Sequence, residues 1–241
     1  EESGILTMPE QNILRRVQAA MQDNLNRVRE LQEKIQKVTG KAVPEFANYY
    51  GAETNRPGRI AARLEDGRND MFEPLMAGLA KSGRTPEQLS ELLHAMHAKE
   101  RNETIAKINE DMPDGGSGMT NAEADSILEK YKNDRALHAW ADKAREIAQT
   151  TLELKLVYGR IDIDTFTQLA THYTHYVPLK GDGEFGAKVK RAMGHEAREE
   201  YILQNLARDY ELAVVDGEKN TARQALLQMA LTNPDPSLWT V

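Results

Sequence analysis

Two pairs of histidines are the first residues in the sequence whose types and spacing could do chemistry. His94 and His97 stand three positions apart, as do His172 and His175, and neutral imidazole is a common zinc ligand. On a helix a step of three residues turns a side chain by about 300°, so Glu91, His94 and His97 spread around the helix. They cannot all converge on one ion. A metal-dependent enzyme built on these pairs stays as an alternative, but we expect no metal site.

Two further motifs suggest a ligand but lack the context that the chemistry requires. The segment GDGEFG at residues 181–186 has the glycine spacing of a dinucleotide-binding loop, yet no β-α-β pattern follows it. Asp162 and Asp164 could hold a divalent cation, but they directly precede a predicted helix, where aspartate is favoured as a cap. We therefore expect no cofactor-binding residue and identify no catalytic residue.

A basic cluster follows the glycine motif. Lys188, Lys190 and Arg191 could contact phosphates at the start of a helix, which makes a nucleic-acid-binding segment an alternative function. The whole chain carries a net charge of −7 with a pI near 5.5, which argues against binding nucleic acid through bulk charge. DNA contact is thus restricted to this local patch.

The composition excludes several classes of protein. With 241 residues, 40% of them hydrophobic, the chain can bury one large core or two small ones. It has no cysteine, so disulfides, thiolate nucleophiles and cysteine zinc sites are excluded. No apolar run approaches the ~20 residues of a membrane span, and the start lacks the pattern of a signal peptide. We expect a soluble chain and, because it begins with Glu1, a piece of a longer polypeptide.

Three helix starts are predicted from a threonine that is followed three positions later by Glu or Gln. They lie at Thr7, Thr85 and Thr120, where this capping-box spacing satisfies two backbone amides at the start of a helix. The loop before Thr120, MPDGGSGM at residues 112–119, has no lysine for phosphate binding. Its glycines are therefore expected to supply turn geometry between two helices.

Three long helices are predicted from apolar residues that recur every three or four positions. They cover residues 9–38, 134–158 and 196–232, and they end before Gly40, Gly159 and Pro234. Shorter helices are expected at residues 44–50, 59–81, 86–109, 121–132 and 164–171, and extended chain only at HYTHYVPL and SLWTV. The fold class is therefore all-α, an elongated multi-helix bundle with long helices and coiled-coil-like packing. The narrow seam of the first helix comprises Leu14, Val17, Met21, Val28, Leu31, Ile35 and Val38.

The predicted domain organisation separates this N-terminal heptad helix, residues 1–40, from a helical domain over residues 41–241. The Gly-rich loop at residues 110–119 marks a sub-boundary within the second part. The heptad seam needs a covering helix. The other long helices of the chain could supply it, or a second copy could do so in a homo-oligomer.

Four segments of the sequence are distinctive in combination: HAKERN at 97–102, MPDGGSGMTNAEA at 112–124, HYVPLKG at 175–181 and EKNTARQALLQMALTNPDPSLWTV at 218–241. Together they resemble a helical region of the large polyvalent proteins of tailed phages and prophages. The resemblance covers roughly residues 60–241. It implies a virion-packaged or injected polypeptide, located in the virion or in the host bacterial cell after genome ejection, whose enzymatic domains lie elsewhere.

The resemblance implies no catalytic residue for this region. Four residues that match its pattern, His97, Glu100, Arg101 and Asn102, could form a buried polar network between helices. Our first hypothesis is a non-enzymatic structural or interaction module whose partners are other domains of the parent phage protein or other virion proteins. A nucleic-acid-binding segment of an injected protein and a metal-dependent enzyme are the alternatives.

Overall fold

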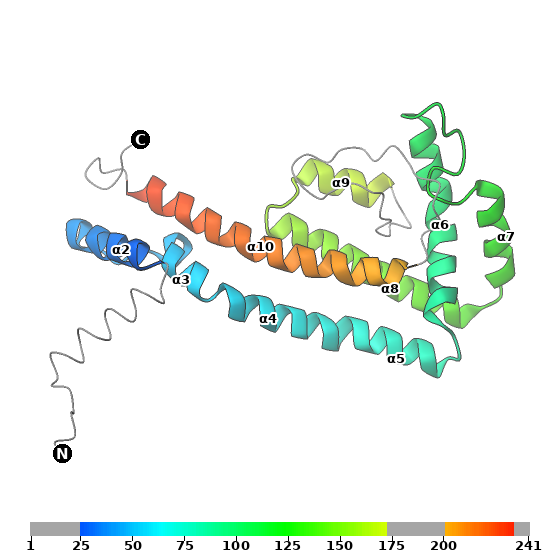
Figure 1. Cartoon of the computed structure of the whole chain (residues 1–241), viewed down its shortest axis with the longest axis horizontal. Helices are drawn as coiled ribbons and strands as arrows, with labels where there is room; N and C mark the ends of the chain where they lie inside the picture. Colours follow the sequence, from blue (N-terminus) through cyan, green and yellow to red (C-terminus); the bar gives the residue numbers. More distant parts are fainter. Residues whose placement is uncertain (1–24, 173–200, 234–241) are drawn as a thin grey trace, which may run out of the picture. The chain divides into compact units, whose positions relative to one another are not determined.

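The computed structural model describes residues 25–172 and 201–233, and Figure 1 shows how they are arranged. Every regular element in this part is helical and no β-strand occurs in it, so the all-α fold class is confirmed. In chain order the elements are α2 (Asn26–Thr39), the 3-10 turn η1 (Glu45–Ala47), α3 (Tyr49–Thr54), α4 (Arg56–Gly67), the π-helical turn η2 (Arg68–Phe72), α5 (Glu73–Lys81), α6 (Pro86–Ala106), α7 (Asn121–Tyr131), α8 (Arg135–Val157), α9 (Ile163–His172) and α10 (Ile202–Thr232).

Helix boundaries follow the capping residues. Thr85 and Thr120 each accept a hydrogen bond from the third helical amide, and the side chain of the Gln or Glu there accepts one from the amide of the cap residue. Both predicted capping boxes are thus confirmed, whereas Thr7 and the two segments predicted as extended chain lie outside the described residues. Gly40, with φ 68°, and Gly159, with φ 64°, adopt the left-handed conformation that ends α2 and α8.

The chain divides into two compact units. The first comprises the described residues of 1–58 and 219–241, and the second comprises residues 59–218. The boundary expected at residue 40 falls inside the first unit, because the end of α10 shares a small core with α2. In that core the buried side chains of Ile35, Ala47 and Met229 pack together, and Val28 and Leu31 border them. The other half of the heptad seam lies outside the described residues.

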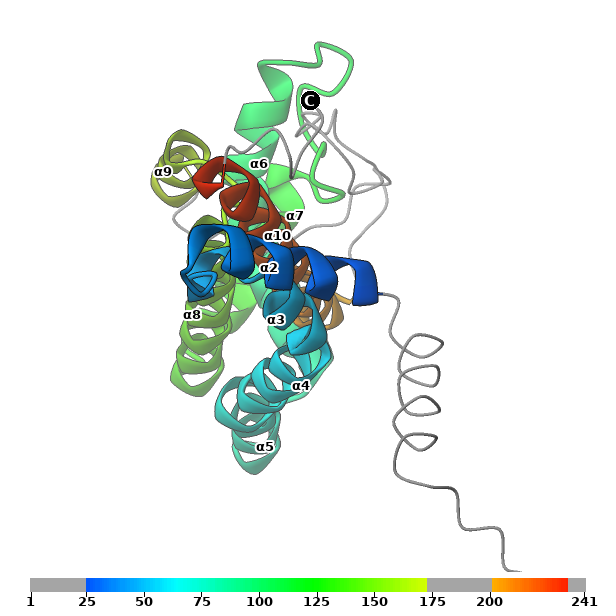
Figure 2. The same ribbon diagram turned by 90° about the vertical axis from the view of Figure 1, so that its left-hand side faces the viewer.

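The second unit contains the larger core. Its α4, η2 and α5 form one continuous rod, α6 stands across the ends of α5 and α8, and α7 lies beside α6 (Figure 1). α9 lies next to α8 in both views (Figures 1 and 2). The apolar periodicity predicted for α8 lies on its buried face. Leu137, Ala144 and Ile147 are all buried in this core.

The helix predicted at residues 59–81 is interrupted by the π-helical turn η2. A π-turn widens the helix by one residue and is often tied to a specific packing need. Here Gly67 precedes η2, and a Cβ on it would lie 2.3 Å from the Tyr210 ring. Phe72 at the end of η2 meets the same ring edge to face, with centroids 5.8 Å apart. The ring of Tyr210 thus packs against η2, between Gly67 and Phe72.

Candidate functional site

Three polar side chains are buried along α6, the helix that the Gly-rich loop joins to α7. His94, His97 and Asn102 are each at most 3% exposed, although α6 belongs to the apolar core on several sides. A buried polar group is costly unless it forms hydrogen bonds. The partners of these side chains therefore define what the site does.

Asn102 fastens the loop to α6. Its amide nitrogen lies 2.8 Å from the Met119 carbonyl oxygen and 3.1 Å from side-chain oxygens of Asp114 and Asn121. Its amide oxygen accepts a hydrogen bond of 2.9 Å from the backbone N–H of Ser117. Because one NH₂ group has only two hydrogens for three acceptors, the donors are shared among them. One side chain thus connects α6, the loop and the first residue of α7.

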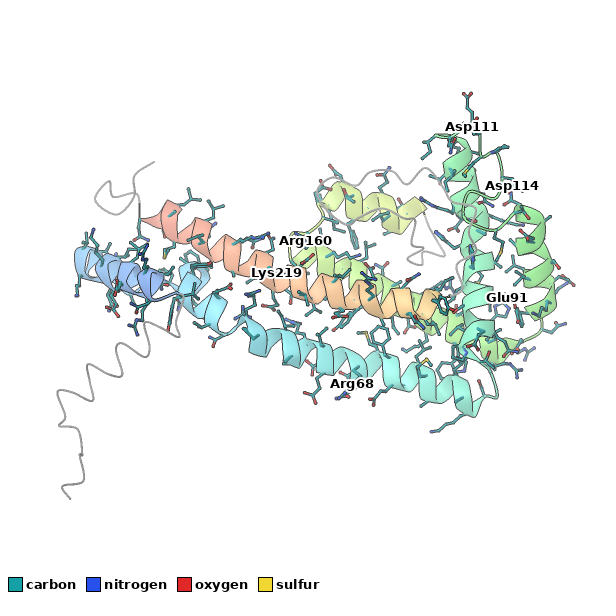
Figure 3. The ribbon with its side chains drawn as sticks, in the orientation of Figure 1. Arg68, Glu91, Asp111, Asp114, Arg160 and Lys219 are labelled. Carbon is teal, nitrogen blue, oxygen red and sulfur yellow. The ribbon has the colours of Figure 1, made fainter. Side chains whose placement is uncertain are left out.

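Asp114 serves the start of α7. Its carboxylate accepts hydrogen bonds from the backbone N–H groups of Gly115, at 2.7 Å, and of Asn121, at 3.0 Å. The first amides of a helix have no partner within the helix, and a negative charge is favourable there. Figure 3 labels Asp114 in the loop beside α6 and α7. The carboxylate therefore acts as a cap, and Gly115 and Gly118, which both have positive φ, supply the turn geometry of the loop.

His94 holds the same loop from the middle of α6. Its Nε2 atom lies 2.9 Å from the Ser117 carbonyl oxygen, and Ser117 is fully buried. Because a carbonyl only accepts, Nε2 must carry the proton. The Ser117 hydroxyl donates to the Met119 carbonyl at 3.1 Å. The loop backbone is thus held at Ser117 on both its N–H and its carbonyl side.

The four residues predicted as a buried polar network all lie on α6. Asn102 bridges the helices through the loop, as described above. His97 Nδ1 lies 3.9 Å from Glu100 Oε2 on the same helix, three residues along. Glu100 and Arg101 are half-buried. His94 and Ser117 belong with Asn102 and were missed, because only the folded loop brings Ser117 to α6.

A second polar cluster ties α4, α8 and α10 together within the second unit. The buried carboxylate of Glu218 accepts a hydrogen bond of 2.8 Å from the Tyr158 hydroxyl and pairs with Arg59 Nε at 2.7 Å. Arg63 Nε lies 3.9 Å from the same carboxylate, and its guanidinium carbon lies 6.0 Å from the centre of the Tyr158 ring. Burial, followed by the hydrogen bond to Glu218, raises the pKa of Tyr158 to about 12.

The same helices are joined again at an ion pair between α8 and α10. Lys155 Nζ lies 2.7 and 2.8 Å from the two carboxylate oxygens of Asp209, and both side chains are largely buried. Sequence reasoning found neither cluster, since the partners are 54 residues apart in this pair and 159 apart in Arg59 and Glu218. The signal in the sequence that could have indicated these clusters was a charged residue within an otherwise apolar helical repeat.

A third polar contact joins α6 to α7 at the other end of the site. Glu91, labelled in Figure 3, accepts hydrogen bonds of 2.6 Å from the Tyr131 hydroxyl and 2.8 Å from Lys130 Nζ. Burial, and then the hydrogen bond to Glu91, raises the pKa of Tyr131, and the hydrogen bond to Glu91 raises the pKa of Lys130. Glu91 is therefore engaged with α7.

The predicted ligand motifs have the following places. Among the described residues, no group of three or more His, Asp and Glu side chains could hold a metal ion. Asp162 accepts a 2.7 Å hydrogen bond from the Thr165 amide at the start of α9, which confirms its expected role as a cap. The side chain of His172, the residue His175, the GDGEFG segment and the basic residues Lys188, Lys190 and Arg191 lie outside what the structure describes.

A small cavity lies in the first unit, between α2 and residues 42–50, with a volume of about 210 Å³. Its polar side is formed by Gln32, whose amide donates to Asn48 Oδ1 at 2.9 Å and accepts from the Tyr50 amide at 2.8 Å. These contacts fasten α3 to α2. The cavity is lined by Arg29, Gln32, Glu33, Gln36, Ala42, Val43, Asn48 and Tyr50.

The chain was compared with models of protein families, with curated proteins and with solved structures, and none of them matches it. Within the described part of the chain, no helix is both long and apolar enough to cross a membrane. The role of the site is therefore inferred from its own contacts. Its buried polar side chains hold the loop between α6 and α7 and join α4, α8 and α10.

Proposed function

We propose that the chain is a non-enzymatic, helical interaction module of a large phage protein that is packaged in the virion or injected. The observation that carries this proposal is the use of the buried polar side chains. Asn102 and His94 bind the loop backbone, and Glu218 is held by Tyr158 and Arg59. Buried polar side chains that are held by hydrogen bonds in this way make a fold specific and rigid. Rigid helices that carry exposed apolar residues are suited to binding other proteins.

The exposed apolar residues support the interaction part of the proposal. In the first unit Val38, Phe46, Leu226, Leu227 and Leu231 are all exposed. Their partners would be other domains of the parent protein, other virion proteins or another copy of the chain. Coiled-coil-like pairing of long helices in an elongated bundle belongs to the same proposal.

The phage context of the proposal rests on the sequence segments that resemble polyvalent phage proteins. Two of them, residues 97–102 and 112–124, supply Asn102, Asp114, Ser117 and Asn121, which meet in one hydrogen-bonded cluster. The resemblance thus falls on residues that cooperate structurally. The proposed location is the virion, and the host bacterial cell after injection.

The experiment that tests this function uses particles of the phage or induced prophage that encodes the chain. We expect mass spectrometry of purified particles to detect its peptides together with those of the parent protein. Particles that lack these peptides would overturn the proposal.

A second arm separates a module from an enzyme. Glu218→Gln keeps the side-chain shape but removes the buried charge. If Glu218 served as an acid or base, the plaque titre would fall by orders of magnitude even with correctly folded protein. A module is expected to tolerate Glu218→Gln whenever circular dichroism shows the helical fold intact.

A further inference from the structure

Three pairs of aspartate followed by glycine occur in the described residues, and only one of them lies in a loop. The pairs at residues 66–67 and 216–217 belong to α4 and α10, whereas the pair at residues 114–115 belongs to the loop between α6 and α7. Aspartate converts into isoaspartate when the backbone nitrogen of the next residue attacks its carboxyl carbon. Glycine in the next position favours this attack, because it has no Cβ to hinder the ring that forms.

A helix holds both reacting groups away from this reaction. Within it each amide N–H donates to the carbonyl four residues earlier, and the backbone angles are fixed. Gly67 has helical angles, with φ −58° and ψ −43°. Gly217 lies inside α10 and against the Tyr158 ring. Asp66 and Asp216 are therefore expected to stay unchanged as long as the chain is folded.

Asp114 and Gly115 are arranged differently. Gly115 has a φ of 76°, and its N–H donates to the Asp114 carboxylate at 2.7 Å. Because a carbon–oxygen bond is about 1.2 Å long, the Gly115 nitrogen lies within about 4 Å of the Asp114 carboxyl carbon. Asp114 is also exposed to water. The two groups that react are thus already neighbours.

Other donors restrain the same carboxylate. The Asn121 backbone nitrogen lies 3.0 and 3.2 Å from its two oxygens, and Asn102 Nδ2 lies 3.1 Å from one of them. Hydrogen-bond donors approach a carboxylate near its plane, whereas a nitrogen attacks the carboxyl carbon from above that plane. The carboxyl group must therefore leave these donors before it can turn its face toward the Gly115 nitrogen.

We propose that Asp114 is a site of isoaspartate formation and that the hydrogen bonds on its carboxylate restrain the reaction. The carboxylate takes up a proton from solvent, the Gly115 nitrogen bonds to the carboxyl carbon, and a hydroxyl leaves with the amide hydrogen as water. A second water opens the resulting five-membered ring at the main-chain carbonyl of Asp114. The backbone then runs through the former side chain and is longer by one methylene, so the new carboxylate no longer caps α7. This chemistry is independent of the proposed function.

The test follows the three pairs in the full chain during several weeks in warm neutral buffer. Peptide mass spectrometry with electron-transfer fragmentation distinguishes isoaspartate from aspartate at each position. Incubation in urea above the unfolding transition should convert all three pairs at similar rates, which supplies the reference rate for each. In the folded chain we expect isoaspartate to accumulate at Asp114 and to be absent at Asp66 and Asp216.

Two variants of Asn121 isolate the restraint. Asn121→Pro removes the N–H that donates to Asp114, and proline is well tolerated at this first position of α7. Thr120 has the extended angles, φ −72° and ψ 159°, that a residue before proline requires. Asn121→Ala is the matched control, because it loses the same side chain but keeps the N–H. We expect conversion at Asp114 to be about tenfold faster in Asn121→Pro than in Asn121→Ala, since a hydrogen bond to a charged group is worth at least that factor.

Two results would overturn the proposal. Conversion at Asp114 no faster than at Asp66 and Asp216 in the folded wild type would mean that the loop protects its aspartate as well as a helix does. Equal rates at Asp114 in the two variants of Asn121 would mean that the hydrogen bond does not restrain the reaction. Circular dichroism checks the fold of each variant, and the comparison of the three pairs in the wild type decides the first point without any variant.

Discussion

At the scale of single residues, Asn102 shows how one buried amide can define a loop. The loop after α6 contains several glycines, which leave its backbone many conformations. Asn102 selects among them because it offers both a donor and an acceptor to backbone groups, those of Met119 and Ser117. A carboxylate at this position only accepts hydrogen bonds, so it could not donate to the Met119 carbonyl. The rigidity of the loop is therefore predicted to depend on this side chain.

The substitution Asn102→Ala should destabilise the second unit by about 2–4 kcal/mol, because it leaves the buried Ser117 N–H and Met119 carbonyl without this partner. Urea unfolding followed by circular dichroism measures the change. Asn133→Ala, at an exposed position of the same unit, is the matched control and should change stability by less than about 0.5 kcal/mol. Equal effects of the two substitutions would contradict the role assigned to Asn102.

Tyr158 provides a prediction at alkaline pH. Its pKa is raised to about 12, compared with about 10 for an exposed tyrosine. A group whose pKa is higher in the folded state contributes stability below the unfolded pKa and loses it as the pH rises through the folded pKa. We therefore expect the free energy of unfolding to fall between about pH 10 and pH 12 more in the wild type than in Tyr158→Phe.

The control for this pH dependence is Tyr201→Phe, which removes a hydroxyl from an exposed ring. Its unfolding free energy should follow the wild-type pH profile. Part of the alkaline loss should persist in Tyr158→Phe, since burial also raises the pKa of Tyr210. Superimposable pH profiles of the wild type and Tyr158→Phe would refute the raised pKa of Tyr158.

At the scale of elements, glycine marks the places where helices approach one another most closely. Gly78 in α5 faces Trp140 of α8, and a Cβ there would lie 2.0 Å from the indole ring. A Cβ added to Gly58 in α4 would meet no atom within 4 Å. The two glycines therefore have opposite expected responses to the same substitution.

Gly78→Ala should destabilise the chain by about 1–3 kcal/mol, because the added methyl forces α5 and α8 apart or moves the indole ring. Gly58→Ala should stabilise it by about 0.5–1 kcal/mol, since alanine has the higher helix propensity. Thermal unfolding of both variants decides the matter. If Gly78→Ala leaves the melting temperature unchanged or raises it, α5 does not pack closely on Trp140 of α8.

The positions of the helices could largely be predicted from the sequence, because their signals are local. Thr85 and Thr120 announce the starts of α6 and α7 by capping boxes, and Gly159 announces the end of α8. The interruption at η2 could not be predicted, since the ring that packs against it belongs to Tyr210, more than a hundred residues further along the chain. The site was predictable only in part. Asn102 lay in a recognised motif, whereas the pairing of Tyr158 with Glu218 is a product of tertiary packing.

At the scale of the whole molecule, the two units have separate cores. The first core is small and is formed around Ile35, Ala47 and Met229. The second is much larger, with Leu92 and Leu137 among its fully buried side chains. A small core stabilises its unit weakly, and regions of one protein can open at different free energies. The first unit is therefore expected to open more readily than the second.

The last prediction tests this difference with hydrogen exchange. Ile35→Ala removes a fully buried side chain and should weaken the first unit by about 2–5 kcal/mol, through lost burial and the cavity left behind. Amides in α2 and in residues 219–232 should then exchange much faster, by about tenfold for each 1.4 kcal/mol, while those of α6 and α8 keep their protection. Leu137→Ala, an equally buried position of the larger core, is the matched control and should accelerate exchange in α6 and α8. Loss of protection throughout the chain in Ile35→Ala would mean that the two units unfold as one, and that the small core contributes to the stability of both.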